Sequence, residues 1–383
     1  MNTWLAYKSK RAYVFQDHIW HLEHYPWPNR KNPESRPRTP LNALMAGPPA
    51  GGFWDPDDKA PRSISEHWFN TVCPESERRI IFTGDVKPAV FWEPGDVIFK
   101  HWERLLTDAP ERCIEVQPSP NGNDSTPQTF DLWLWGSTRV LPLWDGFRTS
   151  PVSRLLGPSA IVKAAIDRNT HLFLPSRNLW LPFLAPRDPY KRMLAIHLRR
   201  GDYKDHCQHL AKYNATFHGW NLLPSLPDKF IHPKFDESGG NTPESDAHYL
   251  NHCYPEHDAI LDKIQKSREE YIRAAASHGD RGRVLDIIFL LTNDATGWVD
   301  ELKMKLTESG WRTIVTTKDL ELDQEQKDVG LVVDMEFAIK AAVFIGNGVS
   351  LFLKSFECMR RPLTEIFFPV VLVYERYCAS TVG

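Results

Sequence analysis

Two consecutive arginines, Arg199 and Arg200, stand directly after the apolar run Met193–Leu198 and before Gly201. The run has the pattern of a strand buried on both faces, and the glycine is a breaker, so both guanidiniums fall at the carboxyl end of a strand. Open α/β sheets bind their ligands at that edge. Because arginine is always charged and forms bidentate hydrogen bonds with phosphate oxygens, the stretch indicates a diphosphate site, with His197 near enough to touch the same ligand.

Polar groups also follow two other apolar runs that we predict as strands. Residues 285–291 are followed by Thr292, Asn293 and Asp294, and residues 343–346 by Asn347, Gly348, Val349 and Ser350. We expect these groups to meet the arginines, because the carboxyl ends of parallel strands lie at one edge of a sheet. The last turn contains a glycine, and its backbone N–H groups together with Ser350 suit a phosphate at a helix start.

Asp334 lies between the apolar stretch 329–333 and a predicted helix, Met335–Ala342. Its carboxylate has two interpretations. It can accept the N–H donors of a guanine ring, or it can cap the helix by accepting a backbone N–H. From the residues alone the helix cap is the favoured interpretation.

Simpler interpretations of the arginine stretch stay open at this point. Two arginines at a strand end are often only part of a solvated loop. Arg200–Asp202 is also an Arg-Gly-Asp triplet, which is an adhesion signal when it lies on an exposed loop. A triplet that directly follows a buried strand is poorly placed as a protruding tip, so adhesion is the weakest of these alternatives.

Histidines are dense between Cys207 and Cys253 and just beside them. They are His206, His209, His218, His232, His248 and His252. His248 and His252 have the i, i+4 spacing of zinc ligands on a helix, but the spacings fit no known zinc module well. We therefore expect solvated loop histidines and no metal. A Cys207–Cys253 disulfide would close this insertion in an oxidising compartment.

The elements that must position these groups alternate between strand and helix. In the second half of the chain, strand patterns at 193–198, 285–291, 312–315 and 343–346 are separated by helical patterns at 260–276, 298–308 and 335–342. Such alternation predicts an α/β fold with a doubly wound parallel sheet. In the first half we predict helices at 96–106, with Asp96 as N-cap, and at 159–168, and strands at 79–82, 89–91 and 130–135.

We predict two domains, 1–187 and 188–383, that meet at a proline-rich, charged joint. The first begins as if inside a strand–helix–strand unit whose first strand is missing. It contains a proline-dominated loop at 25–62 whose aromatic residues indicate a packed excursion of the chain. The second carries the arginine strand and a long polar insertion at 203–256.

Composition excludes several classes of function. The 383 residues are 42% hydrophobic and 25% charged, which is typical of a globular protein, and a net charge of −3 provides no electrostatic footprint for nucleic acid. No apolar run approaches the roughly 18 residues of a membrane span, and the first residues lack the pattern of a signal peptide. Glycosylation sequons at Asn123 and Asn214 have meaning only in the secretory pathway, so the compartment stays open.

The stretch His197–Asp202 resembles the His-x-Arg-Arg-x-Asp signature of the GDP-fucose-dependent fucosyltransferases, the protein O-fucosyltransferases and α-1,6-fucosyltransferases. Two further blocks resemble the same family in the same order. Thr292–Asp294 is similar to its Thr-Asp strand end, and Asp334–Ser350 is similar to its Asp…Ala-x-x-Phe-(Ile/Val)-x-x-x-x-Ser block. The resemblance covers mainly residues 190–352. The proline-rich stretch at 40–73 and the insertion look similar to fungal members.

This resemblance implies a GT-B fold, with two Rossmann-like domains facing across a cleft. It implies an inverting, metal-independent transfer of fucose from GDP-fucose to a protein hydroxyl or glycan acceptor, without a cofactor, and suggests the lumen of the ER or Golgi. By position, Arg199 would bind the β-phosphate as the catalytic residue, His197 would contact the guanosine end, Asp334 would read guanine and Ser350 would contact phosphate. The remaining candidates for the donor site are Arg200 and, less centrally, Asp202, Asp294, Asn347 and Gly348.

The chain also departs from the family pattern. The family's Gly-rich, Asn-containing first loop has no counterpart, Leu351–Lys354 replaces polar residues, and 369–376 resembles nothing in the family. No general base is evident, although Asp202, Asp205 and His206 are candidates. The alternative function is a non-catalytic nucleotide-sugar-binding protein of the same fold, which would bind GDP-fucose without transferring or hydrolysing it.

Overall fold

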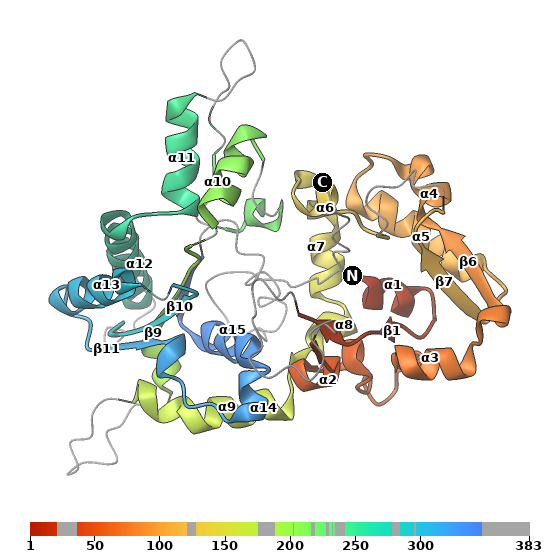
Figure 1. Ribbon diagram of the computed structural model, residues 1–383, viewed down its shortest axis with the longest axis horizontal. Helices are drawn as coiled ribbons and strands as arrows, with labels where there is room; N and C mark the ends of the chain where they lie inside the picture. The colour runs from red at the N-terminus through yellow and green to blue at the C-terminus, as the bar shows by residue number, and fades with distance from the viewer. Residues whose placement is uncertain are drawn as a thin grey trace. The chain divides into compact units, whose positions relative to one another are not determined.

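The computed structural model describes residues 1–20, 37–120, 128–174, 188–201, 203–215, 219–226, 230–231, 233, 242–277, 284–294 and 296–346. The described residues form two compact units, one of residues 1–162 and one of residues 163–346. Each unit mixes helices and strands (Figure 1). The predicted domain boundary at residue 188 adjoins residues 175–187, which lie outside the described part, so it stays a prediction. Among the described residues, no helix has the length and apolar character needed to cross a membrane.

The second unit is built on a four-stranded sheet with the order β11–β10–β9–β12, in which every pair is parallel. The strands are β9 (Met193–Leu198), β10 (Ile287–Thr292), β11 (Thr313–Thr316) and β12 (Val343–Gly346). The chain thus passes from β9 outward through β10 to β11, and then returns to the other side of β9 for β12. The parallel sheet predicted for this half of the chain is confirmed.

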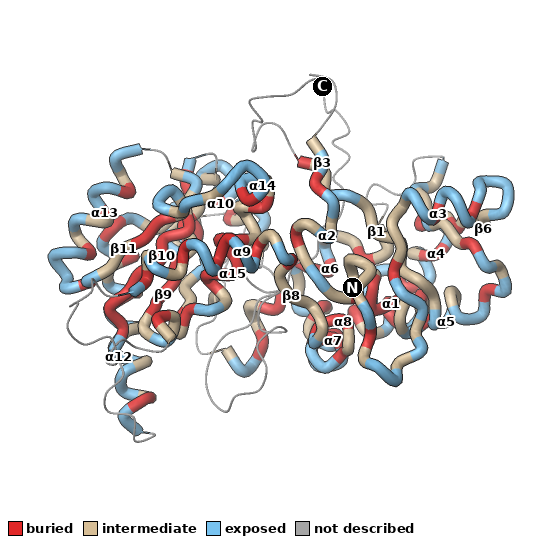
Figure 2. The backbone as a smooth tube through the Cα atoms, turned by 90° about the horizontal axis from the view of Figure 1, so that it is seen from below, coloured by how far each residue is buried: buried red, intermediate tan, exposed pale blue. Residues whose placement is uncertain are grey.

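Helices α12 (His257–Ser277), α13 (Gly297–Glu308) and α15 (Gly330–Lys340) pack against the strands of this sheet. The other helices of this part of the chain are α9 (Ala160–Asn169), α10 (Tyr203–Lys212), α11 (Pro243–Cys253) and α14 (Gln324–Lys327). Leu194, Ile196 and Leu198 of β9 pack in one buried cluster with residues of α12 and α13. Because strand side chains alternate between faces, His197 lies on the opposite face, where Phe289 contacts Phe337 of α15 with ring centroids 5.4 Å apart. Figure 2 shows β9 and β10 as the buried centre of the unit.

The first unit has short strands paired in twos. The pairs are β1 (Val14–Phe15) with β5 (Ile64–Ser65), β6 (Arg78–Phe82) with β7 (Cys113–Gln117), β2 (His18–Ile19) with β3 (Arg38–Thr39), and β4 (Met45–Ala46) with β8 (Gly157–Pro158). Its helices are α1 (Asn2–Lys8), α2 (Leu41–Leu44), α3 (Glu66–Val72), α4 (Thr83–Val86), α5 (Gly95–Asp108), α6 (Leu132–Trp135), α7 (Trp144–Arg148) and α8 (Pro151–Arg154). Trp102 of α5 is fully buried, and this helix anchors the core of the unit.

Two strands predicted in the first unit are wrong. Residues 89–91 fall largely in a 3₁₀ helix, η3 (Lys87–Val90), whose second residue, Pro88, supplies no N–H for a strand ladder. Residues 130–135 contain the single turn α6, which forms because the Asp131 carboxylate accepts a hydrogen bond from the Leu134 N–H at 2.9 Å. Asp96 is also not an N-cap, since α5 already begins at Gly95.

The insertion at 203–256 is held by the predicted disulfide between Cys207 and Cys253, which joins α10 to α11. The insertion is less polar than predicted, because the disulfide forms a small buried core with Ala211 and Tyr249. A second disulfide, Cys73–Cys113, joins the end of α3 to β7 in the first unit. Nothing in the sequence singled out that pair.

We expect the double variant Cys207→Ser/Cys253→Ser to lose roughly 3–4 kcal/mol of unfolding free energy, because the bridge closes a loop of 46 residues. Urea unfolding followed by circular dichroism measures this loss. The matched control is Cys73→Ser/Cys113→Ser, which opens a loop of 40 residues and should cost a similar amount. Unfolding midpoints unchanged by the first double variant would contradict the prediction.

Candidate functional site

The candidate site lies at the carboxyl edge of the sheet in the second unit. β10 and β11 lie on one side of β9 and β12 lies on the other, so the gap between β9 and β12 is the topological switch point. At such a point the connections leave in opposite directions and open α/β sheets bind ligands. Gly346, the last residue of β12, pairs with His197 of β9. The arginine stretch therefore begins at the switch point.

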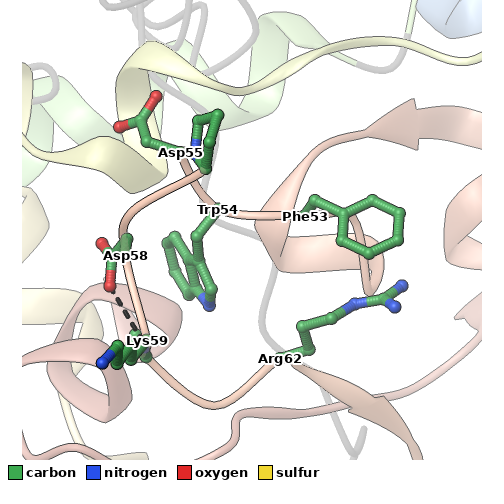
Figure 3. A pocket seen from close by; sticks show the side chains of 8 residues that line it. Phe53, Trp54, Asp55, Asp58, Lys59 and Arg62 are labelled. Atoms are coloured by element: carbon green, nitrogen blue, oxygen red, sulfur yellow. Dashed lines mark hydrogen bonds between the residues drawn. The ribbon is translucent and has the colours of Figure 1, made fainter.

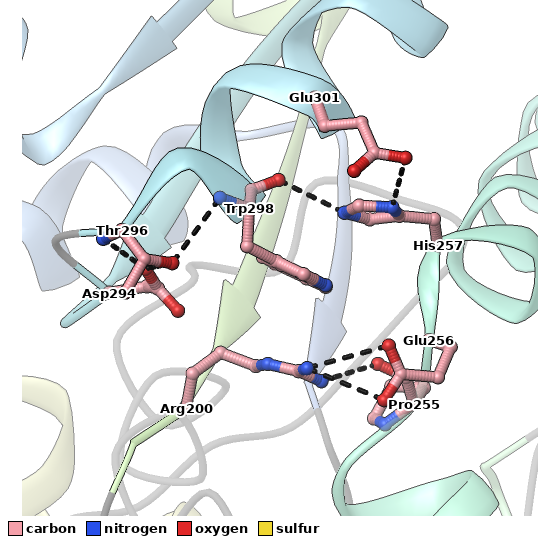
Figure 4. Close-up of polar contacts among 8 residues, drawn as sticks. All are labelled: Arg200, Pro255, Glu256, His257, Asp294, Thr296, Trp298 and Glu301. Atoms are coloured by element: carbon pink, nitrogen blue, oxygen red, sulfur yellow. Dashed lines mark hydrogen bonds and ion pairs between the residues drawn. The ribbon is translucent and has the colours of Figure 1, made fainter.

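Arg200 is buried, with only 6% of its surface exposed. Its guanidinium lies between two aromatic rings, 3.7 Å from the Tyr254 centroid and 4.1 Å from the Trp298 centroid. Nη1 donates a hydrogen bond to the Pro255 carbonyl at 2.8 Å, and Nη2 lies 3.4 Å from a Glu256 carboxylate oxygen (Figure 4). These contacts connect the end of β9 to the starts of α12 and α13.

This geometry gives Arg200 a positioning role that the sequence did not indicate. Both faces of this guanidinium are covered by aromatic rings, and one of its edges donates to a carbonyl. Few of its N–H groups are therefore accessible to a phosphate. The burial of Arg200 also argues against an adhesion function, because a receptor that binds Arg-Gly-Asp needs an accessible arginine. Gly201 itself is exposed. The predicted contact between Arg200 and the diphosphate stays a prediction.

We expect Arg200→Ala to lower the free energy of unfolding by about 2–4 kcal/mol, because it removes a charge-assisted hydrogen bond and two cation–π contacts. Thermal melting measures the loss, and Arg200→Lys, which keeps the charge without the planar fork, should recover only part of it. GDP affinity of the folded variant should change little. If Arg200→Ala instead kept its melting temperature and lost GDP binding, Arg200 would be a phosphate ligand.

Asn293 and Asp294 follow β10 and lie beside the arginine turn. The Asn293 side chain accepts a hydrogen bond from the Arg200 N–H at 2.9 Å and donates one to the Arg200 carbonyl at 3.3 Å. The Asp294 carboxylate accepts from the backbone N–H and the hydroxyl of Thr296, both at 2.6 Å. Partial burial raises the pKa of Asp294, but these hydrogen bonds and the nearby Arg200 outweigh it, so the pKa lies below its usual value. The predicted meeting of these two strand ends is confirmed.

His197 is neutral at physiological pH. Desolvation of the imidazole lowers its pKa, the positive charge of Arg199 lowers it further, and the result is a pKa of about 4. A neutral imidazole can donate one hydrogen bond and accept another, but it adds no charge to the site. The Arg199 guanidinium therefore lies close enough to the His197 ring for its charge to affect the imidazole.

Arg199 differs from its neighbour. Its residue is half-buried, and its guanidinium carbon lies 5.4 Å from the centroid of the Tyr203 ring at the start of α10. Of the two arginines, Arg199 is therefore the one that retains both solvent contact and a position at the switch point. Tyr203 supports it from the side by a long cation–π contact.

Asp334 is not a helix cap, which corrects the interpretation favoured from the residues alone. Helix α15 begins at Gly330, four residues earlier, and the residue before it is Val329. Most of the apolar stretch that we predicted as a lead-in, residues 330–333, forms the first turn of this helix. The carboxylate is thereby held inside the helix, with only 9% of the residue exposed.

The two oxygens of Asp334 have different surroundings. Oδ2 accepts a hydrogen bond from the Thr317 hydroxyl at 2.9 Å, just after β11. Oδ1 is buried and has no hydrogen-bond partner among the described residues. Burial raises the pKa of Asp334, the Thr317 bond lowers it in part, and the pKa is about 7. A buried oxygen without a partner is a position where a ligand donor would fit.

Two features of this region were missed from the sequence. Thr317 has a recognisable signal, since it also follows the carboxyl end of a strand. Glu336 has none: it lies two residues after Asp334, is 6% exposed, and burial raises its pKa to about 7 despite the nearby charges of Lys340 and Lys163. The predicted site residues Asp202, Asn347, Gly348 and Ser350 lie outside the described residues.

The histidine cluster shows no metal site within the described part of the chain, where no group of three or more ligands with metal-binding geometry occurs. His248 and His252 lie on α11 with ring centroids 4.7 Å apart. His248 Nε2 lies 2.9 Å from the Ile231 carbonyl oxygen, and His252 Nδ1 lies 2.8 Å from the His248 carbonyl oxygen. Both rings therefore bond to the backbone. His218 and His232 lie outside the described residues.

A pocket of about 420 Å³ lies in the first unit, within the proline-rich loop (Figure 3). Its two carboxylates have partners. Asp55 forms an ion pair with Arg154 at 2.5 Å, and Asp58 accepts hydrogen bonds from the Tyr7 hydroxyl and the Ala60 N–H, each at 2.9 Å. The predicted packed excursion is confirmed for this part of the loop, whose carboxylates brace the loop itself.

Comparisons with known proteins give the following. No protein-family model matches the chain, and no curated protein matches it. A crystal structure of POFUT1 in complex with GDP is similar with 15% identity and a TM-score of 0.44, over 91% of this chain and 85% of that one. Two crystal forms of POFUT1 in complex with GDP-fucose are similar with 14% identity and a TM-score of 0.46, over 93% of this chain and 86% and 87% of theirs.

Proposed function

We propose that the protein is a fucosyltransferase that moves fucose from GDP-fucose to a hydroxyl of a protein or glycan, by an inverting and metal-independent reaction. The observation that carries the proposal is the placement of Arg199 at the switch point of a parallel sheet, on an edge that also receives His197 and Asp334. The motif resemblance at these three positions supports the same substrate. A GT-B arrangement of two Rossmann-like domains across a cleft belongs to the proposal.

Arg199 would act on the leaving diphosphate. When the bond between fucose C1 and the β-phosphate oxygen breaks, negative charge develops on GDP. A guanidinium that is already held in place stabilises this charge more in the transition state than in the ground state, and so lowers the barrier. Neutral His197 would donate or accept a hydrogen bond at the guanosine end, where no added charge is needed.

Asp334 would select the base. Guanine presents two neighbouring N–H donors on one edge, and a carboxylate presents two acceptors. Thr317 already donates to Oδ2, while Oδ1 has no described partner. An incoming guanine would therefore satisfy a buried oxygen that otherwise carries a desolvation cost. Adenine and uracil do not offer the same pair of donors.

In the proposed step, the oxygen of the acceptor hydroxyl forms a bond to fucose C1 as the bond from C1 to the β-phosphate oxygen breaks. The hydroxyl proton leaves to a base or to water, and GDP departs with the bonding electron pair. The described base candidates Asp205 and His206 are both exposed on α10. The disulfides Cys73–Cys113 and Cys207–Cys253 suit an oxidising compartment such as the ER or Golgi lumen.

We expect GDP and GDP-fucose to bind with unchanged affinity in the presence of EDTA, because guanidinium and backbone N–H groups carry the charge of the diphosphate. Titration calorimetry with and without EDTA measures this. Binding that is lost with EDTA and restored by manganese would contradict metal independence.

Transfer itself is tested by incubating the chain with GDP-fucose labelled in the sugar and following release of GDP and of free fucose. Hydrolysis or transfer supports an enzyme. Tight GDP-fucose binding with neither reaction would favour the alternative, a non-catalytic nucleotide-sugar-binding protein.

A further inference from the structure

The first unit carries an exposed aromatic pair, Phe91 and Trp92, in the loop between η3 and α5. The two residues are 74% and 58% exposed, and their rings stack with centroids 5.6 Å apart and an interplanar angle of 27°. Large aromatic side chains that remain this exposed together indicate an interaction surface more than a core.

The backbone at Trp92 is strained. Its φ is +61°, in the left-handed region that a bulky residue rarely adopts and that glycine adopts freely. A chain that only needed this turn would be more stable with glycine or asparagine at this position. An observed outlier of this kind, at an exposed tryptophan, points to a function of the ring itself.

Neighbouring groups hold the strained turn rigidly. The Arg139 guanidinium carbon lies 4.2 Å from the Trp92 ring centroid, and Arg139 Nη1 donates a hydrogen bond to the Glu93 carbonyl at 3.1 Å. The start of α5 packs tightly on the same segment, η4 (Thr138–Leu143): a Cβ added at Gly95 would lie 3.0 Å from the Arg139 carbonyl oxygen. Arg139 thus supports the Trp92 ring and the backbone next to it before any partner binds.

We propose that Phe91, Trp92 and Arg139, here called the aromatic platform, bind carbohydrate and receive the glycan acceptor. The inference rests on the proposed function, and it names a glycan in preference to a bare peptide as the acceptor. Flat, exposed rings stack on the C–H faces of pyranose sugars. A Trp92 ring that Arg139 already supports loses little entropy on binding, which favours a sugar as the partner.

Polar groups beside the rings match the hydroxyls of a sugar. Glu93 is exposed next to Trp92, and the negative charge of Asp131 acts on Arg139. Carboxylates and a guanidinium accept from and donate to sugar hydroxyls. An apolar peptide would leave these charged groups without partners on desolvation, whereas sugar hydroxyls can pair with them, so the chemistry of the platform favours a glycan over an apolar peptide.

The test is saturation-transfer NMR of the whole chain with chitotriose, lactose and cellobiose as probes. We expect at least one probe to receive saturation. We expect Phe91→Ala and Trp92→Gly each to weaken binding by about tenfold or more, by analogy with the loss of one aromatic side chain that stacks on a nucleic-acid base. Trp92→Phe, which keeps a ring, should retain most of the binding. The matched control is Phe53→Ala, because Phe53 is 76% exposed under the Arg62 guanidinium but lies outside the platform.

Trp92→Gly also separates binding from folding. Glycine relieves the strained φ, so this variant should melt at the same temperature as the parent or higher while it loses the sugar. No saturation of any probe, equal binding by all variants, or self-association that disappears in Trp92→Gly on sedimentation would overturn the inference. GDP calorimetry on the same samples distinguishes the two proposals. If GDP binds but none of the sugars does, the platform proposal is wrong and the donor site is unaffected. If a sugar binds but GDP does not, the donor-site proposal is wrong and the platform is unaffected.

Discussion

Replacing Arg199 with alanine is expected to lower the rate of fucose transfer by about 10²–10³ or more, the effect of removing a preorganised donor to a developing anion. GDP affinity should fall by a smaller factor, because the interaction grows as the bond to fucose breaks. The measurement is single-turnover transfer with labelled GDP-fucose, together with calorimetry for GDP. A rate that falls more than the affinity does is the signature of a group that acts in the transition state.

Arg199→Lys is the informative companion to this variant. Lysine keeps the charge but lacks the planar fork, so part of the rate should return. Arg200→Ala serves as the matched control, because it removes an identical group one residue away that is held between Tyr254 and Trp298. If Arg199→Ala left both binding and transfer intact, the stretch at the end of β9 would be only a solvated loop, and the proposed function would lose its chemical basis.

The parallel sheet of the second unit could be predicted because its signals are local. Each strand is a short apolar run that ends in polar residues, and the observed strands Met193–Leu198 and Val343–Gly346 match the predicted ranges. We predicted that the ends of β9 and β10 lie together, because the carboxyl ends of parallel strands lie at the same edge of a sheet. The hydrogen bonds between Asn293 and Arg200 confirm this prediction.

What the sequence could not reveal depends on contacts between residues far apart in the chain. Nothing local distinguishes Arg199 from Arg200, since the difference comes from rings more than 50 residues away. The helix start at Gly330 was missed because valines favour strands in isolation, and tertiary packing overrode that preference. The positive φ of Trp92 could not be predicted either, because no local sequence pattern indicates a tryptophan in the left-handed region.

Asp334→Ala is expected to reduce the preference for GDP over ADP and UDP by about 10²-fold or more, because a site built to pair polar base edges rejects ligands that leave its groups unpaired. Competition of the three nucleotides for one labelled ligand measures the preference. Glu336→Gln is the matched control: it replaces the other buried carboxylate of the same helix, so it should leave base preference unchanged. If Asp334→Ala kept its full preference for guanine, Asp334 would not select the base, and its role would be limited to the hydrogen bond with Thr317.

The pKa of Asp334 gives this prediction a second readout. Burial raises the pKa from 3.8 to about 7, so the free folded protein holds a proton there at pH 5.5, whereas a carboxylate that accepts two guanine donors must be ionised. GDP affinity should therefore rise with pH up to about 7, by at most about tenfold per unit, and then level off. ADP shares the titration of the diphosphate and serves as the reference. In Asp334→Asn the difference between GDP and ADP should become independent of pH, and a difference that kept its slope would assign the titration to another group.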